Sequence, residues 1–376
     1  MILYLILFLI IVYVLLKAYI RLKMKFWYTQ PVFHIYDLFY WLKPPGVILE
    51  TLPAFNKYIN VFNIKTHAIA AIEEPLLEEV CDFIKAYYVQ SPVATYAPDK
   101  NNIVDYLNES YVTVYQKDEL LAVITARPLT ITLKDQAPFS LYYVDNLCVH
   151  PDYRSKGIAP EMIQTHYYNL RVNNSKIKTC LFKREGTLTA IVPLTTYKTF
   201  CFNIAGLVSS ALTTTNTIEI GENQLTLLLN FIYNQSKNYD CIIMPNISTI
   251  LKMIKTENIY IYGILDLETN LLVAAYAFRR PKLFYDKEEA IECFFSLFDK
   301  NKMIRENYIH GFFISLTKCK EKLKTNILLI EDLAEASLLI SYLTTELNVL
   351  FKSPTAFFLY NYACYTVPSS KALIFY

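Results

Sequence analysis

The sequence predicts a mixed α/β protein (α+β in its arrangement) that is built from two similar halves and preceded by an apolar helix. The chain has 376 residues, the length of about two domains. A helix followed by strands occurs on each side of a threonine-rich segment at 213–217. Residues 1–16 carry no charge. These three observations define the expected architecture.

Residues 1–16 form the first expected element, a helix about 24 Å long, slightly short of the roughly 30 Å hydrocarbon core of a bilayer. Snorkelling of Lys17 extends the possible span to Ile20 or Leu22. A signal peptide and a buried core helix are the alternatives, although the sequence lacks a charged n-region and a small-residue cleavage site. The basic residues at 17, 21, 23 and 25 all follow the span. The sequence therefore predicts a single-pass membrane protein with its catalytic body in the cytosol.

The expected elements of the first half are a helix at 76–89 and strands at 111–115, 120–126 and 129–133. A strand at 140–149 then leads into a helix with Pro160 in its first turn, and further strands are expected at 178–182 and 190–192. The second half is expected to contain a helix at 223–234 and a hairpin of strands at 260–265 and 271–278. Helical segments follow, then a strand at 326–330, a helix at 334–347 and a strand at 356–365.

Composition excludes several kinds of function. The net charge is +2 and no basic stripe is present, so nothing global indicates nucleic-acid binding. The eight cysteines contain no Cys-x-x-Cys pair, and the five histidines do not cluster with them, so no metal site is expected. Cysteines within apolar runs indicate buried free thiols and a reducing compartment.

A basic turn that contains a glycine connects the strand at 140–149 to the following helix. Arg154, Gly157 and Ala159 have the spacing Arg-x-x-Gly-x-Ala, which lets consecutive backbone N–H groups point at one anion. Gly157 relieves crowding beside that anion, and Pro160 suits a helix start. The positive end of the helix dipole faces the same position. The turn therefore predicts a pyrophosphate cradle, and an ordinary charged surface turn is the alternative.

Residues 144–160, VDNLCVHPDYRSKGIAP, resemble the acyl-CoA loop of the GCN5-related N-acyltransferase superfamily and, in detail, N-myristoyltransferases. That family reads Phe-Leu-Cys-Val-His, then Arg-Ser-Lys-Arg, then Ala-Pro. Residues 25–32, KFWYTQPV, resemble its Phe-Trp-x-Thr-Gln-Pro-Val, with an amphipathic membrane-surface stretch as the alternative. Residues 356–362, AFFLYNY, resemble its late Tyr-Tyr-x-Tyr-Asn-Trp. The resemblance covers about residues 25–376, with weak matching between these anchors.

The resemblance implies a tandem GCN5-related N-acyltransferase-like fold, with a mixed twisted sheet and flanking helices in each half. We expect a transmembrane anchor at 1–22, an acyl-CoA-binding half at 23–212 and a peptide-acceptor half at 213–376. The threonine-rich segment is the expected boundary between the two halves.

The chemistry of the family requires a base. A glycine amine is mostly protonated at neutral pH and must lose a proton before it attacks a thioester. N-myristoyltransferases use a buried terminal carboxylate, so the resemblance implies this role for Tyr376, with a frayed terminus as the alternative. Backbone N–H groups of Asn146 and Leu147 would stabilise the developing oxyanion. A Tyr376→Phe variant keeps the carboxylate and is expected to stay active. Cys148 is disfavoured as a nucleophile because no activating histidine and acid are apparent.

The resemblance also implies the contacts to acyl-CoA. Phe26 and Trp27 offer aromatic faces to the adenine, and Lys25 offers a charge to a phosphate. The other candidates lie at the strand end and in the turn: Leu147, Cys148, Val149, Arg154, Ser155, Lys156, Gly157, Ile158, Ala159 and Pro160.

The sequence departs from the family at several positions. Gly157 replaces the second arginine of the turn and restores the general superfamily pattern. Asp145 stands where the family has asparagine before the Phe-Leu pair. The family's Tyr-Thr-Ala-Gly, its acidic loop and its late Gly-Asp-Gly are replaced at 182–185, 89–93 and 351–353. The acyl-CoA half is therefore preserved better than the peptide half.

Together these features predict an enzyme that moves a myristoyl group from myristoyl-CoA to the N-terminal glycine of a protein or peptide. The acyl-CoA is a substrate, and no further cofactor is expected. The alternatives are an acyltransferase with another acyl donor or amine acceptor, and a non-catalytic acyl-CoA- or lipid-binding membrane protein.

Overall fold

A computed structural model of the chain describes residues 2–37, 40, 42–43, 45–89, 94–104, 110–207, 216–285 and 287–376. Its α-helices are α1 (Ile2–Lys23), α2 (Glu74–Tyr87), α3 (Lys100–Val104), α4 (Ile158–Asn173), α5 (Leu225–Ser236), α6 (Ile247–Lys255), α7 (Arg305–Leu323) and α8 (Ala336–Glu346). The first nine strands are β1 (Gly46–Val47), β2 (Ile64–Ala68), β3 (Ala94–Tyr96), β4 (Tyr111–Gln116), β5 (Leu120–Leu133), β6 (Phe139–Val149), β7 (Cys180–Glu185), β8 (Thr195–Asn203) and β9 (Thr217–Glu219). The remaining strands are β10 (Cys241–Met244), β11 (Ile259–Leu265), β12 (Leu272–Arg279), β13 (Leu283–Tyr285), β14 (Glu288–Phe298), β15 (Ile327–Glu331), β16 (Val349–Tyr360), β17 (Tyr362–Ala363) and β18 (Ala372–Ile374).

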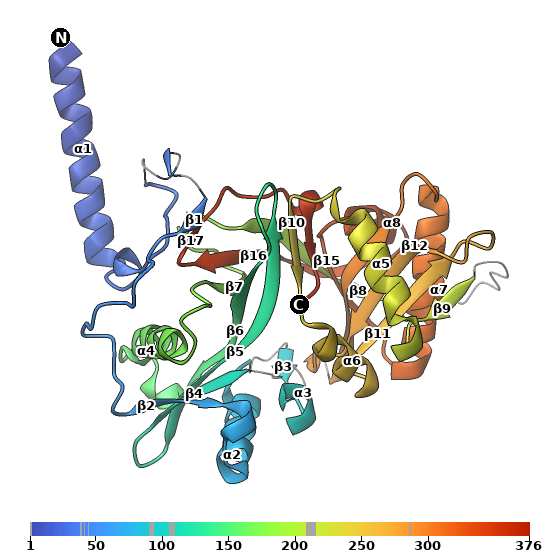
Figure 1. The fold of residues 1–376 in the computed structure, drawn as a ribbon, viewed down its shortest axis with the longest axis horizontal. Helices are drawn as coiled ribbons and strands as arrows, with labels where there is room; N and C mark the ends of the chain where they lie inside the picture. The colour runs from blue at the N-terminus through green and yellow to red at the C-terminus, as the bar shows by residue number, and fades with distance from the viewer. Residues whose placement is uncertain are drawn as a thin grey trace.

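One large mixed sheet runs through the molecule in the order β18-β10-β5-β6-β7-β16-β8-β15-β14-β12-β11-β9 (Figure 1). The same arrangement occurs on both sides of the central pair β16 and β8. Strands β6 and β7 are parallel and connected through α4, while β14 and β15 are parallel and connected through α7. Strand β16 pairs with β7, and β8 pairs with β15. Strands β16, β10 and β18 of the second half thus join the strands of the first half, and β8 of the first half joins those of the second. The expected tandem fold is confirmed.

Most predicted elements lie within a few residues of the observed ones, but three expectations were wrong. The strands expected at 120–126 and 129–133 are one strand, β5, which passes through Pro128. Along β5, pairing with β4 stops at Ala126 and pairing with β10 starts at Thr130. One edge of β5 is thus unpaired at Pro128, which is where a strand tolerates a residue without an N–H.

The expected strand at 190–192 is reduced to an isolated bridge between Ile191 and His34, and the strand proper, β8, begins at Thr195, after Pro193. Proline cannot donate to a ladder, which explains this later start. The third error concerns β14, which lies where helical segments were expected. Its residues from Ala290 onward are all buried, and a fully buried strand has no period that distinguishes it from a buried helix.

Helix α1 stands clear of the body, and none of its residues is buried (Figure 1). The alternative of a buried core helix is therefore wrong. The helix is long and apolar enough to cross a membrane by length and composition. Lys17 lies 3.7 Å from Asp37 of the body, at the point where the helix approaches it.

The end of the chain lies at the centre of the molecule, between the two groups of strands (Figure 1). Strand β18 pairs in parallel with β10, and its residues are buried. Tyr376 is 3% exposed and belongs to the central apolar cluster with Leu141, Tyr143 and Phe357. The terminus is therefore fixed in the core, and the alternative of a frayed end is wrong.

Candidate active site

A β-bulge interrupts the pairing of β5 and β6. Val123 lies opposite Cys148 and Thr125 lies opposite Asp145, so Asn146 and Leu147 together face one residue of β5. Asn146 has a φ of 52°, in the left-handed region. A bulge of this kind re-aims the backbone and disrupts the local ladder. The two residues expected to form the oxyanion hole are thus the two residues of the bulge.

Just before the bulge, β6 separates from its parallel neighbour β7. The two strands pair from Tyr142 and Cys180 to Val144 and Phe182, whereas β6 continues to Val149. A strand edge that lacks a neighbour presents backbone donors and acceptors to a ligand. This open edge leads from the bulge to the basic turn.

The basic turn contains two left-handed backbone positions. Ser155 and Gly157 have φ values of 63° and 86°, and Gly157 is the residue before α4. A Cβ atom added to Gly157 would meet no heavy atom within 4 Å, so the space beside it is open. The N–H groups of the first turn of α4 have no intrahelical partners and favour an anion at this position.

The cations of the turn lie beside this opening. Arg154 donates from Nε to the Val149 carbonyl at 3.1 Å and from Nη2 to the Tyr87 carbonyl at 3.0 Å. Lys156 Nζ lies 4.9 Å from the ring centroid of Tyr153. Arg154 therefore connects the turn to the ends of β6 and α2, while residues 154–157 remain exposed.

The apolar candidates line the inner side of the turn. Leu147, Val149 and Ile158 pack in one cluster, and Ala159 and Pro160 are half-buried in the first turn of α4. Cys148 is buried, and burial raises the pKa of its thiol to about 11. A thiol of this kind is inert, which agrees with the prediction that Cys148 is not a nucleophile.

Lys25, Phe26 and Trp27 lie in the short connection between α1 and the body. Phe26 is buried, with its ring centroid 5.1 Å from that of Tyr58, and Trp27 stacks on Phe182 of β7 at 6.0 Å. Lys25 is exposed. The structure thus packs the aromatic pair onto the first half beside β7.

A cavity of about 500 Å³ lies between the two halves and is lined by both Asn146 and Tyr376. Strands β3 and β13, which come from opposite halves, pair along its wall. The bulge and the end of the chain are far apart in sequence, and the fold brings them into this one cavity. Residues 90–93 of the expected acceptor loop, and 208–215 with most of the expected boundary segment, lie outside the described part of the chain.

Buried charges hold the terminal residue. Arg279 donates from Nη1 to the terminal carboxylate at 3.3 Å and from Nη2 to the Tyr376 phenol at 2.6 Å. The same guanidinium makes two hydrogen bonds with Glu292, at 2.7 and 2.9 Å. Burial alone would raise the pKa of Glu292, but Arg279 outweighs it and the net pKa is lowered. Both ends of Tyr376 are therefore bound to one cation.

A second ion pair lies on the other side of the same phenol. Tyr376 donates to Glu331 Oε1 at 3.0 Å, and Lys183 Nζ lies 2.7 Å from that same oxygen. Burial would lower the pKa of Lys183, but Glu331 and its other neighbours raise it well above its usual value. Sequence reasoning missed Lys183, Arg279, Glu292 and Glu331. The available signal was a charged residue within or at the end of an apolar strand, because such residues are buried only when they are paired.

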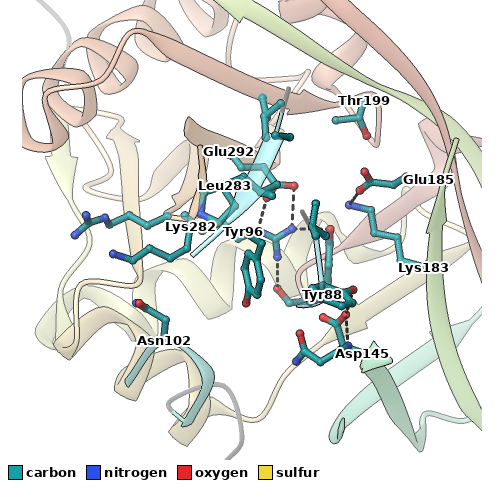
Figure 2. Close-up of a pocket in the computed structure, with 18 of the residues that line it drawn as sticks. Tyr88, Tyr96, Asn102, Asp145, Lys183, Glu185, Thr199, Lys282, Leu283 and Glu292 are labelled. Atoms are coloured by element: carbon teal, nitrogen blue, oxygen red, sulfur yellow. Dashed lines mark hydrogen bonds and ion pairs between the residues drawn. The ribbon is translucent and has the colours of Figure 1, made fainter. Parts of the chain in front are cut away.

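Asp145 and Tyr88 form a third polar group on the cavity wall (Figure 2). Asp145 Oδ1 accepts from the Tyr88 hydroxyl at 3.0 Å and from the backbone N–H of Asn146 at 2.8 Å. The carboxylate and burial together raise the pKa of Tyr88 well above its usual value. One of the two expected oxyanion donors is thus occupied by the neighbouring side chain.

The exchanged strands, the bulge and the turn before α4 define a tandem fold of the GCN5-related N-acyltransferase type. Residues 59–194 match the family described as Myristoyl-CoA:protein N-myristoyltransferase, N-terminal domain. The resemblance to N-myristoyltransferases is thereby confirmed, and with it the expected class of acyltransferase. No curated protein matches the chain in sequence.

Solved structures show the same fold. A crystal structure of Saccharomyces cerevisiae N-myristoyltransferase with bound myristoyl-CoA has a TM-score of 0.71 at 14% identity, over 92% of this chain and 94% of that one. A second structure of the Saccharomyces cerevisiae enzyme with bound myristoyl-CoA has a TM-score of 0.71 at 13% identity, over 96% and 97%. A third, with myristoyl-CoA and inhibitors, has a TM-score of 0.70 at 14% identity, over 96% and 97%. At 13–14% identity this likeness shows the fold alone, and it extends over both halves of the chain.

Proposed function

We propose that this protein transfers a myristoyl group from myristoyl-CoA to the N-terminal glycine of a protein or peptide. The observation that carries the proposal is the meeting of the bulge at Asn146 and the buried terminus at Tyr376 in one cavity. The match of residues 59–194 to the N-myristoyltransferase family supports the choice of acyl donor.

The acyl donor would bind along the first half. Its pyrophosphate occupies the turn from Arg154 to Pro160, where the left-handed backbone at Gly157 leaves room for an anion. Its pantetheine arm follows the open edge of β6, and its thioester reaches the bulge. In this proposal residues 23–212 bind acyl-CoA, and residues 213–376 complete the acceptor side.

The terminal carboxylate of Tyr376 would act as the base. It accepts one proton from the glycine ammonium, and the amine nitrogen then forms a bond to the thioester carbon. As the C–S bond breaks, the electron pair leaves on sulfur, which takes the second amine proton and departs as CoA thiol. The backbone N–H groups of Asn146 and Leu147 would stabilise the charge on the carbonyl oxygen.

A transfer assay tests this proposal. Purified protein in detergent is incubated with myristoyl-CoA and a glycyl peptide, and mass spectrometry measures the acylated product. The same peptide with an acetylated amine should give no product. Mass spectrometry of any acyl-CoA that co-purifies reports chain-length preference. Tight binding of acyl-CoA without transfer to any amine would instead favour a non-catalytic binding protein.

We further propose that α1 anchors the protein in a membrane with its body in the cytosol. The support is a helix with no buried residue, followed by cations at Lys17, Arg21, Lys23 and Lys25. Protease treatment of intact microsomes should digest the body. A fully protected body, or recovery of the full chain in the soluble fraction, would contradict this proposal.

A further inference from the structure

The carboxylates on the cavity wall differ in their partners. Glu185 lies 2.7 Å from Lys183, and Glu292 is held by two hydrogen bonds from Arg279. Asp145 accepts hydrogen bonds only from neutral donors, a phenol and a backbone N–H, within the part of the chain that the structure describes. It is thus the one side-chain carboxylate among the described cavity residues that has no cation as a partner.

A carboxylate without a partner cation in a partly enclosed cavity attracts one, because the low local dielectric strengthens the interaction. Asp145 is half-buried and lies directly before the bulge at which the thioester is expected. The acceptor of the proposed reaction enters as an ammonium ion, which carries the complementary charge. The terminal carboxylate cannot neutralise the whole charge of the ammonium ion, because Arg279 already donates a hydrogen bond to that carboxylate.

The hydrogen bond from Asn146 gives Asp145 a second effect. The backbone N–H of Asn146 is an expected oxyanion donor, and it points at Asp145 Oδ1 at 2.8 Å. An acidic side chain at this point opposes the build-up of negative charge on the thioester oxygen. If the carboxylate turns to an ammonium ion, the N–H is released and the opposing charge is neutralised.

We propose that Asp145 is a catalytic residue that binds the acceptor ammonium and thereby frees the Asn146 N–H for the thioester oxygen. This inference rests on the proposed function and adds to it a requirement for a charged acceptor. The proton itself passes from the ammonium to the terminal carboxylate, and bond formation and C–S cleavage follow as described above. Tyr88 orients Asp145 through its hydroxyl, from the C-terminal end of α2.

Two acceptor peptides separate this role from a structural one. The first carries an N-terminal glycine, which is an ammonium ion at neutral pH, and the second carries an aminooxyacetyl group, which is neutral there. In Asp145→Asn, kcat/KM for the glycyl peptide should fall about 100-fold, in the range observed for the loss of one partner of a desolvated charge pair. For the neutral acceptor it should not fall, and a rise is expected, because no ammonium is bound and the substitution removes the charge that opposes the oxyanion.

Controls make the result specific. Asp118→Asn removes the same charge from the exposed turn between β4 and β5 and should leave both reactions unchanged. Asp145→Glu keeps the charge and should recover part of the glycyl activity. Binding of non-hydrolysable myristoyl-CoA to each variant, measured by calorimetry, verifies that the first half is folded.

Two outcomes would overturn the role of Asp145: an equal loss with both acceptors, or full glycyl activity in Asp145→Asn, which carries the residue that N-myristoyltransferases have there. A wild-type protein inactive toward both acceptors would contradict the proposed function instead. In that case, binding of the glycyl peptide to the protein loaded with non-hydrolysable myristoyl-CoA decides the inference. It should be at least tenfold weaker in Asp145→Asn, in line with the loss of a charge pair, and equal binding would overturn the proposal.

Discussion

The proposed anion cradle at the start of α4 and the buried terminus are built in opposite ways. The cradle consists of consecutive residues, lies open to solvent and depends on two left-handed backbone positions, Ser155 and Gly157. The terminus is enclosed, and the side chains that hold it come from β7, β12, β14 and β15. A change in the cradle should therefore affect one ligand, whereas a change at the terminus should affect chemistry and folding together.

Extension of the chain gives the sharpest contrast between the two regions. Two residues added after Tyr376 move the carboxylate out of the cavity and place polar backbone in an apolar core. If that carboxylate is the base, transfer should fall roughly 10²–10⁴-fold while acyl-CoA binding is kept. Rates of glycyl-peptide acylation and calorimetric affinity for a non-hydrolysable acyl-CoA measure the two effects.

The same dipeptide inserted after Thr269, in the exposed turn between β11 and β12, is the matched control and should leave transfer unchanged. Full activity in the C-terminally extended protein would exclude the terminal carboxylate as the base. If the C-terminal extension abolishes acyl-CoA binding as well as transfer, the terminus and the turn before α4 do not act independently.

Gly157→Glu tests the cradle alone. The substitution forces a side chain onto a φ of 86° and adds negative charge beside the expected pyrophosphate. Affinity for acyl-CoA should fall about 10- to 100-fold, because left-handed strain of about 1–3 kcal/mol is added to charge repulsion. Gly157→Ala carries the strain without the charge and meets no neighbour within 4 Å, so its loss should be smaller. Unchanged affinity in a folded Gly157→Glu protein would place the anion elsewhere.

The sequence was informative where a feature is local. The turn from Arg154 to Pro160 is contiguous, so the residue types of this segment alone predicted a strand end, a glycine that relieves crowding and a helix start. The apolar run at 371–376 predicted a buried end. The sequence could not reveal that Arg279 would reach Tyr376, because β12 and β18 are far apart in the strand order and only the folded sheet brings these residues together. Strand β14 was missed since continuous burial leaves no period to detect.

The sequence assigned no role to the phenol of Tyr376. The structure gives this hydroxyl two partners, which changes the result expected for Tyr376→Phe. The hydroxyl bonds to Arg279 at 2.6 Å and to Glu331 at 3.0 Å, and both partners are buried. Its removal should lower the free energy of unfolding by about 1–3 kcal/mol, because charged groups lose a hydrogen bond without gaining water. Urea unfolding in detergent measures this change. Since the carboxylate remains, transfer should fall far less than in the extended protein, and an equal loss would show that the phenol itself is required.

The smallest effect concerns the inner face of α4, the helix that begins at the cradle. His166 is buried there, with Nδ1 2.6 Å from Thr113 Oγ1, and its Nε2 has no hydrogen-bond partner among the described residues. Burial lowers the pKa of this imidazole to about 3, while an unfolded chain has a histidine pKa near 6.5. Between these values the unfolded state binds the additional proton, so stability falls as the pH falls below about 6.5.

His166→Asn keeps a hydrogen-bonding group for Thr113 and removes this titration. From pH 7 to pH 5, the wild type should lose about 2 kcal/mol more unfolding free energy than the variant, as the linkage relation gives for a shift of this size. Urea unfolding of both proteins in detergent at the two pH values measures the difference, and all other titrating groups cancel in it. Equal losses would mean that the folded protein binds a proton on His166 as readily as the unfolded chain does. The imidazole between α4 and β4 would then not be buried from water.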